Sequence, residues 1–213
     1  MLSIKKFTFG PFQENTFLLF NETNQAVIID PGCYSSSEQS QLLGFIQGNN
    51  LKLQRLLNTH CHVDHIAGNR FIYDQFGLKP WFHENDMPVF QNQKRVSDMY
   101  GLPCDESPQP EGFLSEKDVI SIGEEELEII FTPGHSPGHV VFYNRKNAFL
   151  INGDVLFQQS IGRTDLPLCN HQDLIQSIKN KLFLLPDETR VYCGHGSETT
   201  IGAEKMHNPF LQD

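Results

Sequence analysis

The chain has 213 residues, of which 38% are hydrophobic, and its formal net charge is −10 at neutral pH. A chain of this length buries roughly 70% of its unfolded surface, which is enough for one compact domain. The negative charge argues against a broad nucleic-acid-binding surface, although not against a local basic cleft. No run of about 18 apolar residues and no secretion signal is visible, so neither a membrane partner nor export is predicted, and a cytoplasmic location is expected.

The first half of the chain alternates short strands with helices. Apolar and β-branched residues alternate or cluster between turn formers, which predicts strands over residues 2–10, 15–20, 25–30, 53–58 and 79–82. Helical spacing of apolar residues predicts helices over residues 36–47 and 66–77. The stretch 97–112 is rich in proline, glycine and acidic residues, so a long surface loop is predicted between the two halves.

The second half repeats this organisation. Strands are predicted over residues 118–122, 127–131, 140–143, 148–152 and 189–193. Helices are predicted over residues 171–185 and 200–207. Strand runs with helices in both halves indicate a layered α/β domain with the sheets in the middle and the helices outside.

A cluster of metal-ligand side chains follows the predicted strand 53–58. The sequence THCHVDH places His60, His62, Asp64 and His65 within six positions. Residues two apart do not face each other on a helix, so His60 and His62 would reach one ion from an extended turn. Neutral imidazoles and carboxylates are the ligands that borderline metals such as Zn²⁺ prefer, and the cluster therefore predicts a metal site.

Three further candidates share the local setting of His60, which is an apolar strand that ends in a turn. They are His135 in IIFTPGH, Asp154 in FLINGD and His195 in RVYCGH. Because ligands collect at the carboxyl ends of strands, these residues are expected to converge on the cluster. Five histidines and two aspartates are too many for one four-coordinate ion and suit two ions that share a bridging carboxylate. Two such ions together activate water and polarise a substrate oxygen, which predicts hydrolysis.

The order of these motifs resembles a known family. IDPG, THCHVDH, TPGHSPGH, NGD, GRTD, GHG and the closing NPFL occur as they do in the metallo-β-lactamase superfamily, in its short glyoxalase II (hydroxyacylglutathione hydrolase) branch. The resemblance covers essentially the whole chain. It implies an αββα sandwich of mixed sheets flanked by helices. It also implies that residues 1–213 form a single domain, without the C-terminal helical domain that grips glutathione in larger glyoxalase II enzymes.

The resemblance also implies a role for each candidate ligand. One metal would be held by His60, His62 and His135, and the other by Asp64, His65 and His195. Asp154 would bridge the two divalent ions, which are expected to be zinc, with iron or a mixed pair as alternatives. A hydroxide between the ions would attack a thioester carbonyl, and Asp64 and Asp154 are therefore the expected catalytic side chains.

Two residues outside this set are assigned roles around it. Arg163 in GRTD stands where the family carries a basic contact to an anionic substrate end, and the alternative is an ion pair with Asp165. Asp30 is expected to hydrogen-bond a ligand imidazole and fix its tautomer, against an ordinary turn aspartate. The remaining histidines are predicted to have local structural roles: His83, His139, His171 and His207.

The sequence leaves a small set of functions open. The first is hydrolysis of a small-molecule thioester of the hydroxyacylglutathione type. The alternative is a mononuclear iron persulfide dioxygenase that uses His60, His135 and Asp154 and leaves open positions for oxygen and sulfur. A nuclease of the same superfamily would add a clamping domain and basic patches, so nucleic acid is not an expected partner. The acyl and thiol halves of the substrate, the native metal and the oligomeric state stay open.

Overall fold

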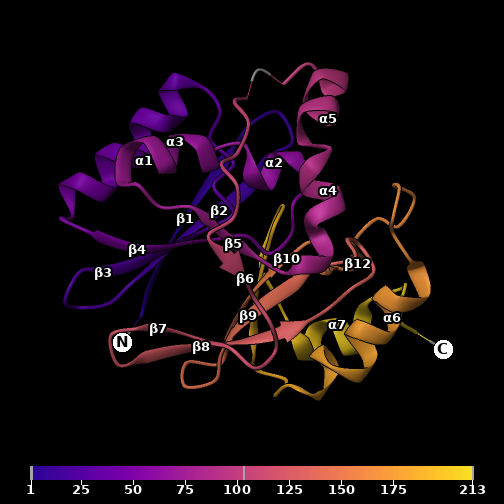
Figure 1. The fold of residues 1–213 in the computed structure, drawn as a ribbon. Helices are drawn as coiled ribbons and strands as arrows, with labels where there is room; N and C mark the ends of the chain where they lie inside the picture. The colour runs from indigo at the N-terminus through magenta and orange to yellow at the C-terminus, as the bar shows by residue number, and fades with distance from the viewer. Residues whose placement is uncertain (1, 103, 213) are drawn as a thin grey trace.

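In the computed structural model, which describes residues 2–102 and 104–212, two six-stranded sheets lie face to face with helices on both outer sides (Figure 1). The first sheet contains the N-terminal strands β1 (Ser3–Phe9), β2 (Glu14–Phe20), β3 (Gln25–Ile29), β4 (Lys52–Leu57), β5 (Pro80–Phe82) and β6 (Gly112–Phe113), in that order. The strands β1 to β3 pair antiparallel, whereas β3 to β6 pair parallel. The sheet is therefore mixed, as expected.

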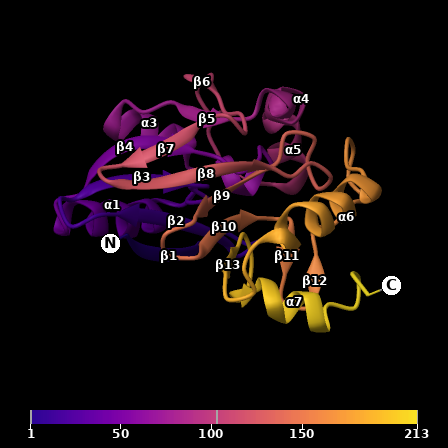
Figure 2. The same ribbon diagram turned by 90° about the horizontal axis from the view of Figure 1, so that it is seen from below.

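The second sheet is also mixed. Its order is β14 (Thr199–Thr200), β13 (Arg190–Cys193), β10 (Phe149–Gly153), β9 (Val140–Asn144), β8 (Glu125–Phe131) and β7 (Val119–Ile122). The pair β10 and β13 is parallel and the other pairs are antiparallel. A separate hairpin of β11 (Leu156–Phe157) and β12 (Ser160–Ile161) extends beyond this sheet (Figure 2).

The helices lie outside the two sheets. They are α1 (Ser36–Gly48), α2 (Val63–Ile66), α3 (Asn69–Phe76), α4 (Met87–Gln91), α5 (Gln93–Tyr100), α6 (His171–Asn180) and α7 (Ile201–His207), with 3₁₀ turns at Glu84–Asp86 and Leu182–Leu184. Within the described residues no helix is long and apolar enough to cross a membrane.

Three apolar layers hold this arrangement together. Phe17 and Leu57 of the first sheet and Phe142 of the second belong to the cluster between the sheets, whose members are almost fully buried. Leu42 of α1 belongs to the cluster on the outer face of the first sheet, and Leu174 of α6 to that on the second. Burying each such side chain stabilises the fold by about 1.5–3 kcal/mol. The predicted order of helices, two sheets and helices is therefore confirmed.

Two predicted elements differ from those observed. The predicted loop 97–112 begins with the last turns of α5, which ends at Gly101 in a left-handed conformation (φ 66°). The predicted helix 66–77 is interrupted between α2 and α3, because the Gly68 amide donates to the Pro31 carbonyl at 2.7 Å instead of continuing one helix. The helices α4 and α5 cover one side of the site described next, and their presence was not predicted.

Candidate metal centre

The side chains predicted as metal ligands converge at one end of the space between the sheets. His60 follows β4 of the first sheet, and His135, Asp154 and His195 follow β8, β10 and β13 of the second. The short helix α2 begins directly after His62 and contributes two more members of the set, Asp64 and His65. The structure thus brings all seven candidates together from both sheets.

The first group contains three histidines from two loops. The ligand atoms of His60, His62 and His135 all lie within 4.8 Å of one another. The Nδ1 atom of His62 is 2.9 Å from Nε2 of His135. Ligand nitrogens around a tetrahedral zinc ion lie about 3.3 Å apart for bonds of about 2.0–2.1 Å. The spacing of this group is therefore close to that of co-ligands of one ion.

The second group is centred on α2. The ligand atoms of Asp64, His65 and His195 also lie within 4.8 Å of one another. Asp154 lies between the groups, because its Oδ2 is 3.6 Å from Nε2 of His135 and 3.5 Å from Nε2 of His195. Its other oxygen, Oδ1, is 3.5 Å from Nε2 of His65. One carboxylate therefore faces both groups.

Hydrogen bonds on the far side of the rings orient the histidines. Nδ1 of His135 lies 2.8 Å from the Arg163 carbonyl and Nδ1 of His195 lies 2.9 Å from the Phe12 carbonyl. A carbonyl oxygen only accepts, so Nδ1 carries a proton in both rings and Nε2 is the atom that points toward the centre. Nδ1 of His65 is similarly 3.0 Å from Oδ2 of Asp30.

Several atoms at the centre fit a cation better than any protein hydrogen bond. Nε2 of His60, Nε2 of His65 and Oδ1 of Asp154 are buried and have no hydrogen-bond partner among the described residues. Leaving such a group unpaired costs about 1–3 kcal/mol. A divalent ion in each group would satisfy these atoms, so the donor set fits metal ions.

The surroundings keep His60, His62 and Asp154 in the forms that bind metals. Burial, with nearby His135, lowers the pKa of His62 to about 3, and burial lowers the pKa of His60 well below its usual value. Burial alone would raise the pKa of Asp154, but His65 and His195 hold it well below the usual range. The imidazoles of His60 and His62 are therefore neutral, and the carboxylate of Asp154 is ionised, at neutral pH.

Two glycines in the ligand motifs allow this convergence. A Cβ atom on Gly194, beside His195, would lie 2.2 Å from Oδ1 of Asp154 and 2.8 Å from Cε1 of His65. Gly153, beside Asp154, has φ of 51°, and a Cβ atom there would lie 2.4 Å from Oγ1 of Thr59. The ends of β10 and β13 approach the centre this closely only because neither glycine has a side chain.

Asp30 and Arg163 lie at the edge of the centre. Asp30 accepts from the Thr59 amide at 2.7 Å and lies beside His65, which is the expected contact with a ligand imidazole. Arg163 forms the alternative ion pair, with Nε and one terminal nitrogen 2.7 and 2.8 Å from the two carboxylate oxygens of Asp165. The Arg163 guanidinium is therefore already paired, while its carbonyl orients His135.

His139 has a larger role than its sequence context suggests. Its ring is fully buried and stacks on His60 at 4.7 Å between ring centroids. Its Nε2 accepts from the Asp154 amide at 3.1 Å. The partner lies 15 positions away, so only the packing of β9 beside β10 brings the two together. His139 thus fixes the backbone that carries Asp154.

Asp86 joins the two loops that carry the first histidine group. This buried carboxylate accepts from the Cys61 amide at 2.6 Å, and Cys61 lies between His60 and His62. It also accepts from the Gly138 amide at 2.7 Å and from the Ser136 hydroxyl, in the loop that carries His135. No pattern in the sequence distinguishes Asp86 from an ordinary turn aspartate, because both of its partner loops are distant in sequence.

We expect Asp86→Asn to bind fewer metal ions per chain than the wild type. The amide keeps the size of the side chain but turns an N–H donor toward groups that are themselves donors, at a cost of about 1–3 kcal/mol. Metal content by elemental analysis, together with thermal unfolding with and without a chelator, measures the change. Asp98→Asn, on the exposed side of α5, is the matched control. Wild-type metal content and metal affinity in Asp86→Asn would contradict the role.

The four layers and the clustered ligands define a metal-dependent hydrolase fold, and the chain belongs to the metallo-β-lactamase superfamily, whose model matches residues 9–195. The hydroxyacylglutathione hydrolase GloC of Haemophilus influenzae is 38% identical over 202 residues, or 94% of this chain and 93% of that protein. The solved structure of the B3 metallo-β-lactamase BLEG-1 is 38% identical with a TM-score of 0.90, covering 99% of this chain and 100% of that one.

A third relative bears on the metal. The structure of TTHA1623 in a di-iron-bound form is 37% identical with a TM-score of 0.88, and it covers 97% of this chain and 100% of that one. The family and the αββα architecture inferred from the motifs are thus confirmed. The protein is a metallo-hydrolase of this superfamily, with a cluster of histidine and aspartate side chains suited to divalent metals.

Proposed function

We propose that this metallo-hydrolase cleaves a small-molecule thioester of the hydroxyacylglutathione type with two divalent ions. The observation that carries the proposal is the carboxylate of Asp154, which lies within 3.6 Å of His135 in one ligand group and 3.5 Å of His195 in the other. The name of the GloC relative supports the reaction, and the di-iron form of TTHA1623 supports a pair of ions. Zinc is our first choice of metal, and iron or a mixed pair is the alternative.

The ligand assignment follows the two geometric groups. His60, His62 and His135 would hold one ion, and Asp64, His65 and His195 the other, with Asp154 between them. When bound, two such ions supply a strongly nucleophilic water at neutral pH and polarise the carbonyl under attack. Burial alone would raise the pKa of Asp64, but His65 and His195 lower it. Asp64 is therefore ionised and can accept a proton from the attacking water.

The cysteines are poorly placed to act as the nucleophile. Cys61 lies inside the ligand motif, yet its side chain is buried in the apolar cluster of Phe82 and Phe90, and burial raises its pKa well above the usual value. Cys33 is buried in the outer cluster of the first sheet, and burial raises its pKa to about 12. Both thiols stay protonated, which favours water as the nucleophile.

A cleft of about 840 Å³ opens over the centre and is lined by His62, Asp64, His135, Asp154 and His195. Its size suits a small-molecule substrate rather than nucleic acid. Arg163 also lines this cleft. By the family resemblance, it is the candidate residue for contact with an anionic end of the substrate. We propose that the enzyme is cytoplasmic.

The test is to purify the protein without added metal or chelator, determine its metal content by elemental analysis, and assay a panel of thioesters. About two ions per chain with thioester hydrolysis would support the proposal. One iron per chain, with oxygen consumed in the presence of a persulfide, would replace the proposal with the dioxygenase alternative. A β-lactam belongs in the panel because BLEG-1 is a B3 metallo-β-lactamase by name.

Removing the metal is expected to lower the thermal midpoint as well as the activity. Without a cation, the buried Nε2 atoms of His60 and His65 have no hydrogen-bond partner among the described residues. A ligand at 1,000 times its dissociation constant stabilises the native state by about 4 kcal/mol. Thermal unfolding after chelator dialysis, and again after zinc is restored, measures this. An unchanged midpoint in all three samples would contradict a resident metal.

A further inference from the structure

One wall of the cleft over the centre is formed by α4 and α5. These helices lie across the cleft from the segment that connects β12 to α6 (Figure 1). Asn92, Arg95, Val96 and Met99 all line the cleft, and their spacing of three, four and seven positions places them on one face of α5. Nothing in the described structure covers this face, so it is open to a ligand bound at the metal centre.

This wall is apolar and exposed. Met99 is 70% exposed and Tyr100 is 45% exposed, and both line the cleft. The ring of Tyr100 meets the ring of Phe12 edge to face at 5.4 Å, which continues the apolar surface onto the β1–β2 turn. Leu168, 56% exposed, lines the opposite side. Exposed apolar residues gathered around a cleft mark a binding surface, because each would gain from being covered.

The charges on the cleft are unlike those of the rest of the chain. Among the described residues that line the cleft, the only acidic ones are Asp64 and Asp154, which belong to the metal centre, and the only arginine or lysine residues are Arg95 and Arg163. Arg163 is already paired with Asp165. Among residues 2–102 and 104–212, Arg95 has no ion pair. In a chain with a net charge of −10, the one unpaired guanidinium at the cleft is available to an anion.

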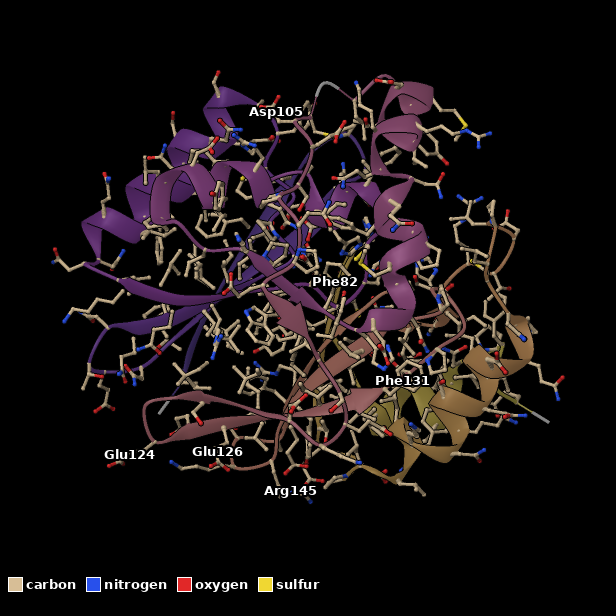
Figure 3. The ribbon with its side chains drawn as sticks, in the orientation of Figure 1. Phe82, Asp105, Glu124, Glu126, Phe131 and Arg145 are labelled. Atoms are coloured by element: carbon tan, nitrogen blue, oxygen red, sulfur yellow. The ribbon has the colours of Figure 1, made fainter. Side chains whose placement is uncertain are left out.

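The acidic residues of the β7–β8 turn do not offset this charge. Glu124 and Glu126 lie at this turn, with Arg145 close by, at the end of the molecule opposite α5 (Figure 3). On α5 itself, Lys94 is held by Asp98 at 2.6 Å, and neither residue lines the cleft over the centre. Arg95 is therefore the only cation of α5 that lines this cleft.

We propose that the substrate is an apolar acyl thioester of an anionic thiol, with Arg95 binding the anion and the exposed wall of Val96, Met99, Tyr100 and Phe12 holding the acyl group. This inference rests on the proposed thioester hydrolysis and specifies the substrate, with an apolar acyl group in place of a hydroxyacyl group. Arginine suits the role because its planar guanidinium binds a carboxylate or a phosphate with two parallel hydrogen bonds. We assign the anion to the thiol half because the wall that would hold the acyl group is lined by Val96, Met99, Tyr100 and Phe12.

The experiment pairs variants of the metal-loaded enzyme with substrates that differ in one feature. Octanoyl-glutathione is compared with octanoyl-glutathione diethyl ester, whose carboxylates are blocked, and with acetyl-glutathione, whose acyl group is small. Octanoyl-coenzyme A distinguishes a phosphate from a carboxylate as the bound anion. The variants are Arg95→Gln and Met99→Ser, and their matched controls outside the cleft lining are Lys94→Gln and Met206→Ser.

We expect Arg95→Gln to raise KM for octanoyl-glutathione 10- to 100-fold, with kcat within threefold of the wild type. The same variant should leave KM for the diethyl ester within twofold. We expect Met99→Ser to lower kcat/KM about fivefold for the octanoyl substrate and less than twofold for the acetyl substrate. Both controls should behave as the wild type. Added salt should raise KM for the anionic substrate in the wild type and not in Arg95→Gln.

A binding measurement separates this inference from the hydrolysis itself. S-octylglutathione cannot be hydrolysed, and its dissociation constant is measured by calorimetry for wild type, Arg95→Gln and Lys94→Gln. If Arg95→Gln binds it as tightly as the wild type does, the role of Arg95 is overturned even when thioesters are cleaved. If no thioester is cleaved but Arg95→Gln weakens binding at least tenfold, the anion site stands and the proposed reaction is wrong. Equal turnover of octanoyl and acetyl substrates would overturn the apolar wall.

Discussion

Asp154→Asn is expected to lower kcat/KM for a thioester by at least about 100-fold and to reduce the metal content. The carboxylate lies between the two histidine-containing groups, 3.5 Å from Nε2 of His65 and 3.6 Å from Nε2 of His135. Breaking a buried charge pair costs about 3–5 kcal/mol. A cost of this size corresponds to a loss of roughly 100- to 1,000-fold or more in metal affinity. Asparagine keeps the shape but carries no charge to balance two cations.

Elemental analysis and steady-state kinetics on the same preparations measure this effect. Asp187→Asn is the matched control, because Asp187 is an exposed aspartate that pairs with Lys205 away from the centre. The control should keep the metal content and activity of the wild type. Full metal loading and full activity in Asp154→Asn would contradict its position as the bridging ligand.

Asp30→Ala is expected to lower the free energy of unfolding by about 3–5 kcal/mol. Asp30 is 1% exposed and accepts from the amide and the hydroxyl of Thr59, at 2.7 and 2.6 Å. Its Oδ2 is also 3.0 Å from Nδ1 of His65. Removing the carboxylate leaves these buried donors unpaired and frees the imidazole to rotate. Metal affinity of the second group should therefore fall together with stability.

Urea unfolding of the metal-loaded and chelated proteins separates the two contributions. Asp30→Asn keeps one acceptor oxygen and should lose about 1–3 kcal/mol, so it tests the role if the alanine variant does not fold. The control is Asp74→Ala, an exposed residue on α3 that pairs with Arg70 on the surface. An effect of Asp30→Ala no larger than that of the control would show that the hydrogen bonds to Thr59 and His65 contribute little.

The sequence predicted most of the elements because their signals are local. The strands around residues 2–30 and the helix that became α1 carry their apolar pattern and turn residues within a few positions, and α1 also has the predicted start, with a capping box at Ser35 and Glu38. The short helices α4 and α5 were missed because they span only five and eight residues, and because the proline and glycine residues that follow them indicated a loop. These two helices form the wall that the further inference rests on.

The residues of the candidate site also differ in whether local sequence signals reveal them. His60, His62, Asp64 and His65 stand in one short segment, so their chemistry is visible without a fold. His135, Asp154 and His195 could be added only because each follows a strand in a similar local setting, and the structure brings them to the same place. Glu14 and Asp86 carry no such signal. Glu14 is nevertheless buried 3.9 Å from His65, with Oε1 unpaired in the described structure, and Asp86 ties two ligand loops together.

The sequence by itself determined the layered class, the family and the candidate metal-binding side chains, because residue type, spacing and strand-end position are properties of neighbouring residues. Only the tertiary structure decided that Asp154 faces both groups, that Arg163 is paired with Asp165 and that Arg95 faces the cleft unpaired. The first and the last of these facts depend on distances between residues that are far apart in the chain, and the pair of Arg163 with Asp165, two positions apart, depends on the conformation of its loop. Such distances are set by the packing of the two sheets and of the helices around them, which no local pattern specifies.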